Sequence, residues 1–297
     1  MITPDTDSAP SLAALYLKRI NFIGDCAPTL ANLQKLQFLH ATHIPFGNTA
    51  SFLGQAVPLD LEYLQHKLLV QNREGYCFEQ SLLIQQALTE LGYHAVNRLG
   101  RVYFMATPSE TPAQSHLVTI VQVDGEDYLY DPNFGGMSPT APLSLNRIGQ
   151  TQQTPHEPYR FIPVNESGLA PQTLTGMHYM LQAYVLEEWI NLYAFNPTQP
   201  VAANDVKVAN WYISTSPESL FTQHLIMAIA TPDARINLMD NTVKIHNREG
   251  TTQRVLETVE DFARFFEQRL KIVRGRVDYE VLVGKTKQVT ATARSED

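Results

Sequence analysis

The chain has 297 residues, which is enough for two or three domains of ordinary size. Hydrophobic residues make up 44% of the chain and charged residues 18%, a globular composition that excludes wholesale disorder. The formal net charge of −8 argues against a nucleic-acid partner, because proteins that bind nucleic acids usually carry a basic surface.

The N-terminus and the cysteines point to a cytoplasmic protein. Residues 1–10 are polar, without the apolar core of a signal peptide, and no run of about 18 apolar residues follows. We therefore expect no membrane partner. The two cysteines, Cys26 and Cys77, are too few for a disulfide scaffold, and a free thiol suits a reducing compartment.

Helical signals dominate the first third of the chain. Thr29 and Asp60 stand where N-caps are expected, and Pro45 ends the helix that Thr29 begins. Gly92 stands where a left-handed C-cap is expected. The predicted helices span residues 12–20, 30–42, 61–70 and 78–91, and residues 45–54 are predicted to form a loop. We interpret residues 1–92 as a helical domain.

Strand signals follow Gly92. The clearest is a hairpin in which Asp124-Gly125 forms the turn between the runs 115–123 and 128–131. An earlier strand candidate is interrupted at Gly100. Further strands are predicted at 96–104, 159–163 and 180–195, and residues 197–205 are predicted to be a linker. We interpret residues 93–200 as a second domain built from strands.

The last third mixes strands with a helix. Thr258, with Asp261 three residues later, predicts a capping box that opens a helix over 259–270. The polar tail from Lys285 is expected to be frayed. Strands are predicted at 225–230, 235–238, 242–246 and 251–256. Residues 201–297 are therefore expected to hold a linker and an α/β domain, and the chain to belong to the α+β class.

Cys77 lies on the first turn of a predicted helix, two residues after a glycine. Unpaired backbone N–H groups and the positive end of the helix dipole stabilise a thiolate at such a position. Arg73 adds a positive charge nearby. On position alone, a buried and inert cysteine is an equal alternative, so the partners of the thiol decide between the two.

The hairpin offers partners for this thiol. If Asp124-Gly125 is the two-residue turn, position 123 pairs with position 126, and Asp131 becomes the diagonal neighbour of His116. Diagonal neighbours share a face of the sheet and lie roughly 7–8 Å apart, within reach of His and Asp side chains. The placement of the turn therefore predicts that a base, His116, and the carboxylate that orients it, Asp131, lie side by side.

Cys77, His116 and Asp131 are thus the candidate catalytic residues, because a thiol nucleophile needs a base and the base needs an orienting group. His40 and His43 lie three residues apart on a predicted helix, but no acidic or cysteine partner with metal-binding spacing accompanies them, so we expect no metal. The chain lacks the glycine-rich motifs that bind phosphates or dinucleotides.

Several segments resemble the arylamine N-acetyltransferase family. Residues 73–79, Arg-Glu-Gly-Tyr-Cys-Phe-Glu, resemble the family signature Arg-Gly-Gly-x-Cys-x-Glu. His116-Leu-Val and the later segment 130–136 are similar to the family's histidine and aspartate segments. Further matches lie at 45–48, 61–68 and 210–221, so that the resemblance covers about residues 15–270.

The resemblance implies an N-terminal helical bundle, a β-barrel and a C-terminal α/β lid, with a papain-like Cys-His-Asp triad. It implies an acyltransferase of xenobiotic metabolism that works by a ping-pong mechanism. The Cys77 thiolate would take an acetyl group from acetyl-CoA as a thioester and pass it to an arylamine, an arylhydrazine or a related amine. His116 would deprotonate Cys77, and Asp131 would orient the ring. The implied partners are coenzyme A and a small aromatic amine or hydrazine, and the oligomeric state stays open.

The resemblance also suggests roles for neighbouring residues. Phe134 matches a residue that lines the acceptor pocket in the family, and we predict Phe134, Gly135 and Gly136 to be substrate-binding residues. For Phe134, an aromatic core residue is the alternative. Arg73 and Glu79 match the signature, and we expect them to form an ion pair that holds the loop.

Four places depart from the family pattern. Glu74 stands where the family usually has Gly, Gly47 where it usually has Glu, Ser81 where Asn is frequent, and Pro132-Asn133 where Val-Gly is common. A carboxylate three residues before the thiol opposes thiolate formation, so we expect Glu74 to point at a cation or at water. The departures bear on acceptor preference and rate more than on the class of reaction.

Three other functions are compatible with parts of this pattern. Amide synthases that close a macrolactam in polyketide biosynthesis keep such a triad but receive the acyl chain from a carrier protein. A cysteine hydrolase on the same triad would release acetate from acetyl-CoA without an amine. A non-catalytic binding protein is disfavoured because all three triad residues are present.

Overall fold

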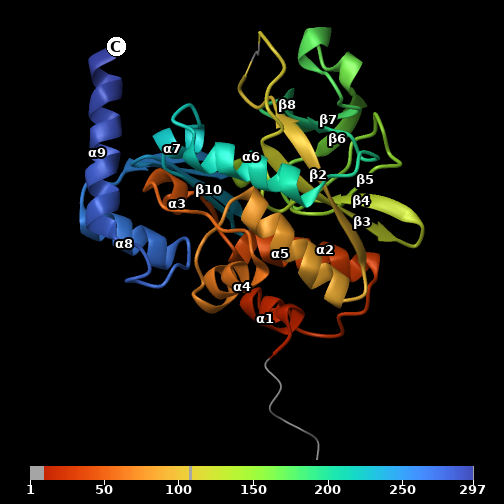
Figure 1. Ribbon diagram of the computed structural model, residues 1–297, viewed down its shortest axis with the longest axis horizontal. Helices are drawn as coiled ribbons and strands as arrows, with labels where there is room; N and C mark the ends of the chain where they lie inside the picture. Colours follow the sequence, from red (N-terminus) through yellow and green to blue (C-terminus); the bar gives the residue numbers. More distant parts are fainter. Residues whose placement is uncertain (1–9, 107–108, 297) are drawn as a thin grey trace, which may run out of the picture.

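The computed structural model describes residues 10–106 and 109–296 (Figure 1). Helices form the first part of the described chain and gather at the lower side of the view. Their bounds are α1 Leu12–Arg19, α2 Leu30–His43, α3 Thr49–Phe52, α4 Leu61–Leu64, the π-helical turn η1 Gln65–Val70 and α5 Cys77–Glu90. Over the ranges that the structure describes, no helix has both the length and the apolar character needed to cross a membrane.

Local hydrogen bonds set the predicted ends of these helices. The Thr29 side chain accepts from the backbone N–H of Asn32, and the Asp60 side chain accepts from that of Tyr63. Each such cap contributes about 1 kcal/mol. Gly92 has a φ of +88°, the left-handed conformation that suits glycine after a helix. The predictions at these three positions are confirmed.

Helices α1, α2, α4 and α5 share one apolar core with the turn η1. Each Leu or Ile buried there contributes roughly 1.5–3 kcal/mol relative to an exposed side chain. Val121 and Tyr130 join this core from the neighbouring sheet, so the helices pack directly on that sheet. The main helical contributors are Tyr16, Leu33, Leu36, Leu64, Leu68, Leu83, Ile84 and Leu88.

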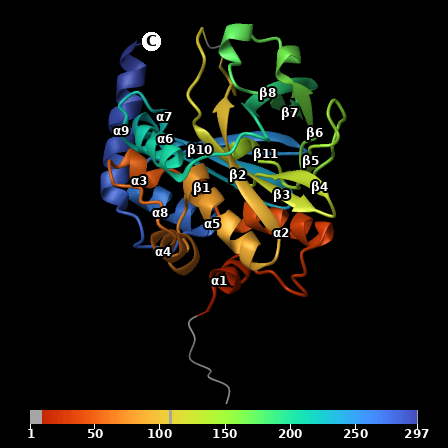
Figure 2. The ribbon, with the colours of Figure 1, turned by 45° about the vertical axis from the view of Figure 1, so that its right-hand side comes forward.

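The second part is an antiparallel sheet, whose described strands follow the order β5-β4-β3-β2-β8-β7-β6 (Figure 2). The strands are β2 His94–Val102, β3 His116–Val123, β4 Glu126–Tyr130, β5 Leu143–Ser144, β6 Tyr159–Pro163, β7 Tyr179–Val185 and β8 Glu188–Phe195. Short 3-10 turns are η2 Gly135–Met137, η3 Val164–Glu166 and η4 Pro171–Thr173. After β5 the backbone of Gln152 pairs with Tyr159 on β6, which nearly closes the sheet into a barrel.

The predicted hairpin has the predicted register. Val123 pairs with Glu126, and the two turn residues, Asp124 and Gly125, have φ values of 51° and 80°. Positive φ at both positions is the geometry of the two-residue turn that matches the twist of the strands. This register fixes which residues of β3 and β4 share a face.

The C-terminal part runs from α6 to α9. Its elements are α6 Ala203–Thr215, α7 Leu220–Gln223, β9 Ile226–Ala230, β10 Ala234–Met239, β11 Thr242–Asn247, β12 Gly250–Val255, α8 Val259–Gln268 and α9 Tyr279–Glu296. The side chain of Thr258 accepts from the N–H of Asp261, as the predicted capping box requires. Helices α8 and α9 pack against the strands through a core that includes Leu238, Val243, Phe262, Phe266 and Leu282.

Two sequence-based expectations for the C-terminal part are wrong. The predicted linker at 197–205 already contains the first turn of α6. The tail from Lys285 is not frayed but lies within α9. Leu282 and Val283 are buried at the start of that helix, and this packing stabilises a polar sequence that has little helical signal of its own.

The helical part contributes one strand to the last sheet. In the segment predicted to be a loop, β1 Phe46–Gly47 pairs with β9, and the described sheet has the order β1-β9-β10-β11-β12. Asn48 is buried beside it, and its amide donates to two carbonyl groups of the α7 segment at 2.9 and 2.8 Å. The same side chain accepts from the N–H of Ile226 at 2.7 Å. The prediction of a plain loop is therefore wrong, because the partner strand comes much later in the sequence.

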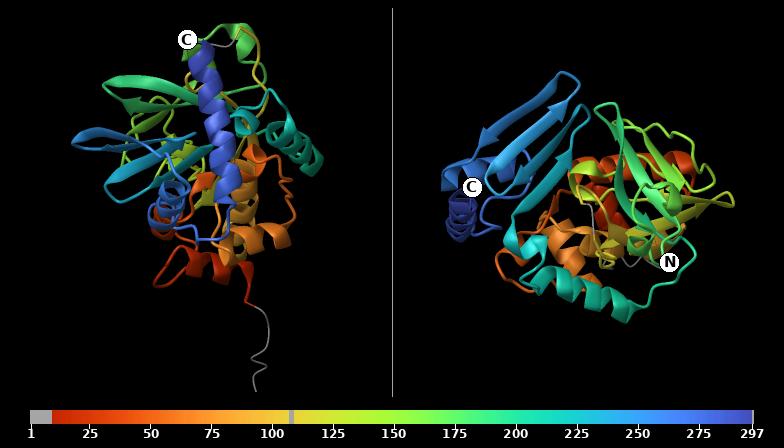
Figure 3. Two further views of the ribbon diagram at one scale, coloured as in Figure 1. Left: turned by 90° about the vertical axis from the view of Figure 1, so that its left-hand side faces the viewer. Right: turned by 90° about the horizontal axis from the view of Figure 1, so that it is seen from above.

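Figure 3 shows how the parts meet. Seen from above, the strands of the C-terminal part in blue lie beside the green strands of the second part, and α6 in teal runs along one side of both. The helical part lies beneath them, so residues from all three parts come together at the centre.

Candidate active site

Cys77 is the first residue of α5, one position before the predicted start of this helix, and it lies on the first turn as predicted. Tyr76 precedes it in an extended conformation, and Gly75 is packed so tightly that an added Cβ would lie 2.8 Å from Leu68. Cys77 is 3% exposed, and its Sγ lies 3.9 Å from the carbonyl oxygen of Ser115. The thiol therefore faces the start of β3 across the first turn of the helix.

His116 and Asp131 lie next to this thiol. His116 begins β3, Asp131 directly follows β4, and His116 Nε2 lies 2.9 Å from Asp131 Oδ2. Both side chains are buried, and the carbonyl oxygen of Ser115, the residue before His116, contacts Cys77 Sγ. Three separate elements thus bring together the three residues that the sequence singled out.

The surroundings of His116 favour a proton on its ring. Burial lowers the pKa of His116, but the charge and the hydrogen bond of Asp131, together with Cys77, outweigh burial and raise the pKa to about 10. An imidazole in this setting can accept the proton of a thiol and remain charged beside the carboxylate.

Tyr193 on β8 is a member of the site that sequence reasoning missed. Its hydroxyl donates to Asp131 Oδ2 at 2.5 Å, and its ring centroid lies 4.7 Å from that of His116. Burial, followed by the charge of Asp131, raises the pKa of Tyr193 well above its ordinary value, so the hydroxyl keeps its proton. No motif marks this tyrosine, because only the order of the strands brings β8 beside β2.

Gly100 is a close-packing position and not the strand break that was predicted. Strand β2 continues through it, and Gly100 pairs with His116 on one side and with Phe195 on the other. An added Cβ would lie 3.0 Å from the carbonyl oxygen of Ala194. The glycine therefore allows the backbones next to His116 to approach one another.

Phe134, Gly135 and Gly136 form a turn beside His116. The centroid of the Phe134 ring lies 5.0 Å from that of His116. Gly135 has a φ of +79°, which favours glycine, and a Cβ on Gly136 would lie 2.6 Å from Oδ1 of Asn237. Of these three predicted substrate-binding residues, Phe134 has the side chain that a ligand could contact.

The charged residues before α5 pair differently from the prediction. The expected ion pair of Arg73 with Glu79 is wrong, because Lys67 Nζ lies 2.5 Å from Glu79 Oε1, and Arg73 Nη2 lies 2.9 Å from Glu74 Oε1. Glu74 is fully buried and also accepts from the hydroxyl of Thr49. Burial raises the pKa of Glu74, but Arg73 and Lys67 outweigh this effect and lower it. Glu74 therefore points at a cation, as predicted.

Ser81 and Asn133, two further departures from the family pattern, contact each other. Asn133 Nδ2 donates to Ser81 Oγ at 3.0 Å, and Ser81 donates to the carbonyl oxygen of Leu117 at 2.6 Å. The backbone N–H of Asn133 also lies 3.4 Å from Asp131 Oδ1. The Asn133 amide thus connects the segment that carries Asp131 to the helix that carries Cys77.

A cavity of about 520 Å³ opens beside Ser115. Ser115, whose carbonyl oxygen contacts the Cys77 thiol, is one of the residues that line this cavity. Its lining includes Leu99, Arg101, Gln114, Trp211 and Tyr212. Within residues 10–106 and 109–296, no three side chains of His, Cys, Asp or Glu gather in a way that could hold a metal ion.

Known proteins are similar to this chain in sequence and in fold. A family model described as N-acetyltransferase matches residues 29–277. The arylamine N-acetyltransferase of Mycolicibacterium smegmatis is 39% identical over 244 residues, which cover 81% of this chain and 84% of that enzyme. The enzyme of Mycobacterium tuberculosis strain H37Rv is 40% identical over 240 residues, or 80% of each chain.

Solved structures agree. The arylamine N-acetyltransferase of Mycobacterium marinum has a TM-score of 0.85 and 38% identity, over 93% of this chain and 99% of its own. The same enzyme in complex with CoA has a TM-score of 0.83 and 38% identity, over 92% and 98%. The chain therefore belongs to the arylamine N-acetyltransferase family and is an enzyme of the acetyltransferase type. The sequence-based predictions of family, fold class and enzyme class are confirmed.

Proposed function

We propose that this protein moves an acetyl group from acetyl-CoA to an aromatic amine or hydrazine by a ping-pong mechanism in which Cys77 carries the acetyl group. The observation that carries the proposal is the buried His116–Asp131 pair, which begins one residue after the carbonyl group that contacts the Cys77 thiol. A related enzyme of known structure is described in complex with CoA, which supports acetyl-CoA as the donor.

In the first half-reaction His116 accepts the proton of the Cys77 thiol, and the thiolate attacks the carbonyl carbon of acetyl-CoA. A new C–S bond forms to Cys77, the C–S bond to CoA breaks, and the proton on His116 passes to the CoA thiolate. Exchange between two thioesters is nearly isoenergetic, which suits a cysteine. Unpaired N–H groups in the first turn of α5 are suitable donors for the transient oxyanion.

In the second half-reaction the amine attacks the acetyl group on Cys77. A C–N bond forms, the C–S bond to Cys77 breaks, and His116 moves the amine proton to the departing thiolate. Asp131 holds the ring in place and stabilises its positive charge in both halves. Phe134, edge to face with His116, offers an aromatic wall to an aromatic acceptor.

Intact-protein mass spectrometry tests the proposal. Acetyl-CoA alone should add the mass of one acetyl group, peptide mapping should place it on Cys77, and an aromatic amine should remove it. Cys26 serves as the internal control, and Cys77→Ser should fold but accept no acetyl group. Acetyl on Cys26, or none on either cysteine, contradicts the assignment. Loss of the acetyl group as acetate without amine indicates a hydrolase, and acylation only from a carrier protein indicates an amide synthase.

The division into domains 1–92, 93–200 and 201–297 is also a proposal, supported by a main apolar core in each of these parts. The pairing of β1 with β9 crosses the first and third of them. We further propose a cytoplasmic location, because both cysteines are free thiols and a catalytic thiol needs reducing surroundings.

A further inference from the structure

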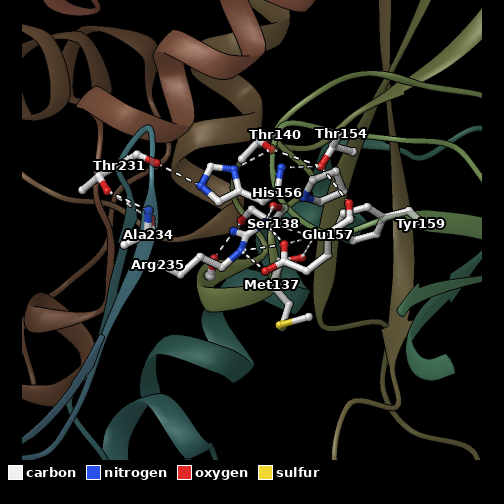
Figure 4. Close-up of polar contacts among 12 residues, drawn as sticks. Met137, Ser138, Thr140, Thr154, His156, Glu157, Tyr159, Thr231, Ala234 and Arg235 are labelled. Carbon is white, nitrogen blue, oxygen red and sulfur yellow. Dashed lines mark hydrogen bonds and ion pairs between the residues drawn. The ribbon is translucent and has the colours of Figure 1, made fainter. Parts of the chain in front are cut away.

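A buried arginine of the C-terminal part contacts the turn that carries Phe134 (Figure 4). Arg235 on β10 is 4% exposed, and its Nη2 donates to the carbonyl oxygen of Ser138 at 2.9 Å and to the hydroxyl of Tyr159 at 3.2 Å. Tyr159 in turn donates to the carbonyl oxygen of Met137 at 3.1 Å. One guanidinium group therefore holds the end of the turn both directly and through Tyr159.

Glu157 fixes the orientation of this guanidinium group. Arg235 Nε lies 2.8 and 2.7 Å from the two carboxylate oxygens of Glu157, and Nη2 contacts the same carboxylate. Burial raises the pKa of Glu157, but Arg235 outweighs burial and lowers it, so the pair is ionised at neutral pH. A lysine has a single charged nitrogen and cannot reproduce this planar set of contacts.

Neighbouring residues support the same arrangement. Burial lowers the pKa of His156, and the neutral ring donates from Nε2 to the carbonyl oxygen of Thr231 at 2.9 Å and accepts at Nδ1 from the Thr140 hydroxyl at 3.0 Å. Farther along β10, Asn237 lies so close to Gly136 that a Cβ there would be 2.6 Å from its Oδ1. Arg235 on β10 thus contacts the turn 134–138. Thr231, just before β10, is connected through His156 to Thr140, which follows that turn (Figure 4).

We propose that Arg235 is a positioning residue for the acceptor. It fixes the turn 134–138 and thereby the Phe134 ring beside His116, so the C-terminal part sets acceptor selectivity although it holds none of the triad residues. This inference rests on the proposed transfer function and adds a residue to it. Because Arg235 contacts neither Cys77 nor His116, its loss should spare the first half-reaction.

Arg235→Lys tests the inference, since it keeps the positive charge and removes the planar contacts. The measurements are the rate of acetyl-Cys77 formation from acetyl-CoA and the kcat/KM values for an aromatic amine and for hydrazine, which has no ring to contact Phe134. We expect acetyl-Cys77 formation and hydrazine acetylation within about twofold of the unmodified protein. We expect kcat/KM for the aromatic amine to fall about tenfold, because a small displacement of the Phe134 ring would misplace the bound amine.

Arg160→Lys on β6 is the matched control. Arg160 Nε lies 2.8 Å from Gln182 Oε1, and the guanidinium lies 4.2 Å from the ring centroid of Trp189, away from the turn. This variant should leave the ratio of the two kcat/KM values unchanged. If Arg235→Lys does not fold, Tyr159→Phe removes one hydroxyl from the same set of contacts and should lower the ratio in the same direction.

Equal losses for both acceptors, or an unchanged ratio in a folded variant, overturn the inference. A first half-reaction that slows in step with the second also overturns it, because a general structural defect has that effect. If the unmodified protein forms no acetyl-Cys77 at all, the proposed function fails and the inference fails with it.

Discussion

Residues that depart from the family pattern meet in pairs. Gly47 and Glu74 exchange the usual Glu and Gly, and a Cβ on Gly47 would lie 2.6 Å from Cγ of Glu74. Ser81 and Asn133 are joined by a hydrogen bond of 3.0 Å. Glu74 occupies the space that a side chain on Gly47 would need, and Ser81 and Asn133 depend on each other through their hydrogen bond, so a change at one member of a pair affects the other. The sequence showed four separate departures because spacing alone does not reveal which positions meet.

Glu74→Gly should destabilise the protein by about 3–5 kcal/mol, because it leaves the mostly buried Arg73 without its carboxylate. This loss exceeds the roughly 1 kcal/mol that a glycine costs by itself. Adding Gly47→Glu should recover part of the stability, since it returns a carboxylate to the same space beside the flexible end of Met227. Urea unfolding of the single and double variants measures both effects.

The reactivity of Cys77 should respond much less. Alkylation of Cys77 by iodoacetamide should stay within about threefold in folded Glu74→Gly, because Glu74 is already paired with Arg73. Glu260→Gln, which weakens two exposed ion pairs, with Arg264 and with Arg274, is the control and should hardly change stability. A Glu74→Gly protein as stable as the unmodified one contradicts the role given to this pair.

His116 should make stability depend on pH. Its pKa of about 10 in the folded protein lies above the ordinary value of 6.5, so the folded state binds this proton more tightly. Its stabilising contribution is full below about pH 6.5 and declines as the pH rises through about 10. The difference in unfolding free energy between the unmodified protein and His116→Gln should therefore shrink across this range. A difference that grows with pH shows that the ring is neutral in the folded state.

At the scale of elements, local signals predicted structure well. The hairpin of β3 and β4 has the predicted register because two turn residues determine it, and the Thr258 cap begins α8 as expected. Elements that depend on distant partners were missed or misread. Strand β1 has its partner far along the chain, the polar α9 depends on its packing, and Tyr193 reaches Asp131 only through strand order.

Two glycines that look alike in sequence should respond oppositely to alanine. Gly100→Ala should cost about 1–3 kcal/mol, because its Cβ would lie 3.0 Å from the carbonyl oxygen of Ala194 in the packed sheet. Gly284→Ala on α9 should stabilise the protein by about 0.5–1 kcal/mol, since nothing lies within 4 Å of the added Cβ. Thermal unfolding of both variants measures the contrast, and a shift of the same sign in both contradicts it.

At the scale of the whole molecule, the site is assembled from three parts. The helical part carries Cys77, the seven-stranded sheet carries His116 and Asp131, and the C-terminal part supplies Arg235 against the Phe134 turn. The arrangement of these parts came from the family resemblance, because periodicity and turn signals cannot order strands that pair over long distances. Apart from the predicted meeting of Cys77 with His116 and Asp131, the contacts between the parts could not be predicted from the sequence.

Asn48→Ala should weaken the connection between the helical and C-terminal parts. It removes three hydrogen bonds and leaves their backbone partners unpaired, so we expect a loss of about 3 kcal/mol or more. Asn32→Ala removes one side-chain bond within the helical part and should cost about 1 kcal/mol. Urea unfolding followed by tryptophan fluorescence and circular dichroism compares the two variants. Equal losses contradict the connecting role of Asn48.

The pairing of β1 with β9 has a consequence for synthesis on the ribosome. Phe46 emerges about 180 residues before its partner Ala228, which is a wait of roughly 10–40 s at ordinary translation rates. During that time the nascent chain lacks the β9 partner of this strand, which lies beside the nucleophile, and an exposed strand edge favours aggregation. Ribosome-bound chains stalled before β9 should be cut readily by protease within residues 45–54, and chains that have released β12 should resist. Equal cleavage of both would show that this segment closes without its late partner.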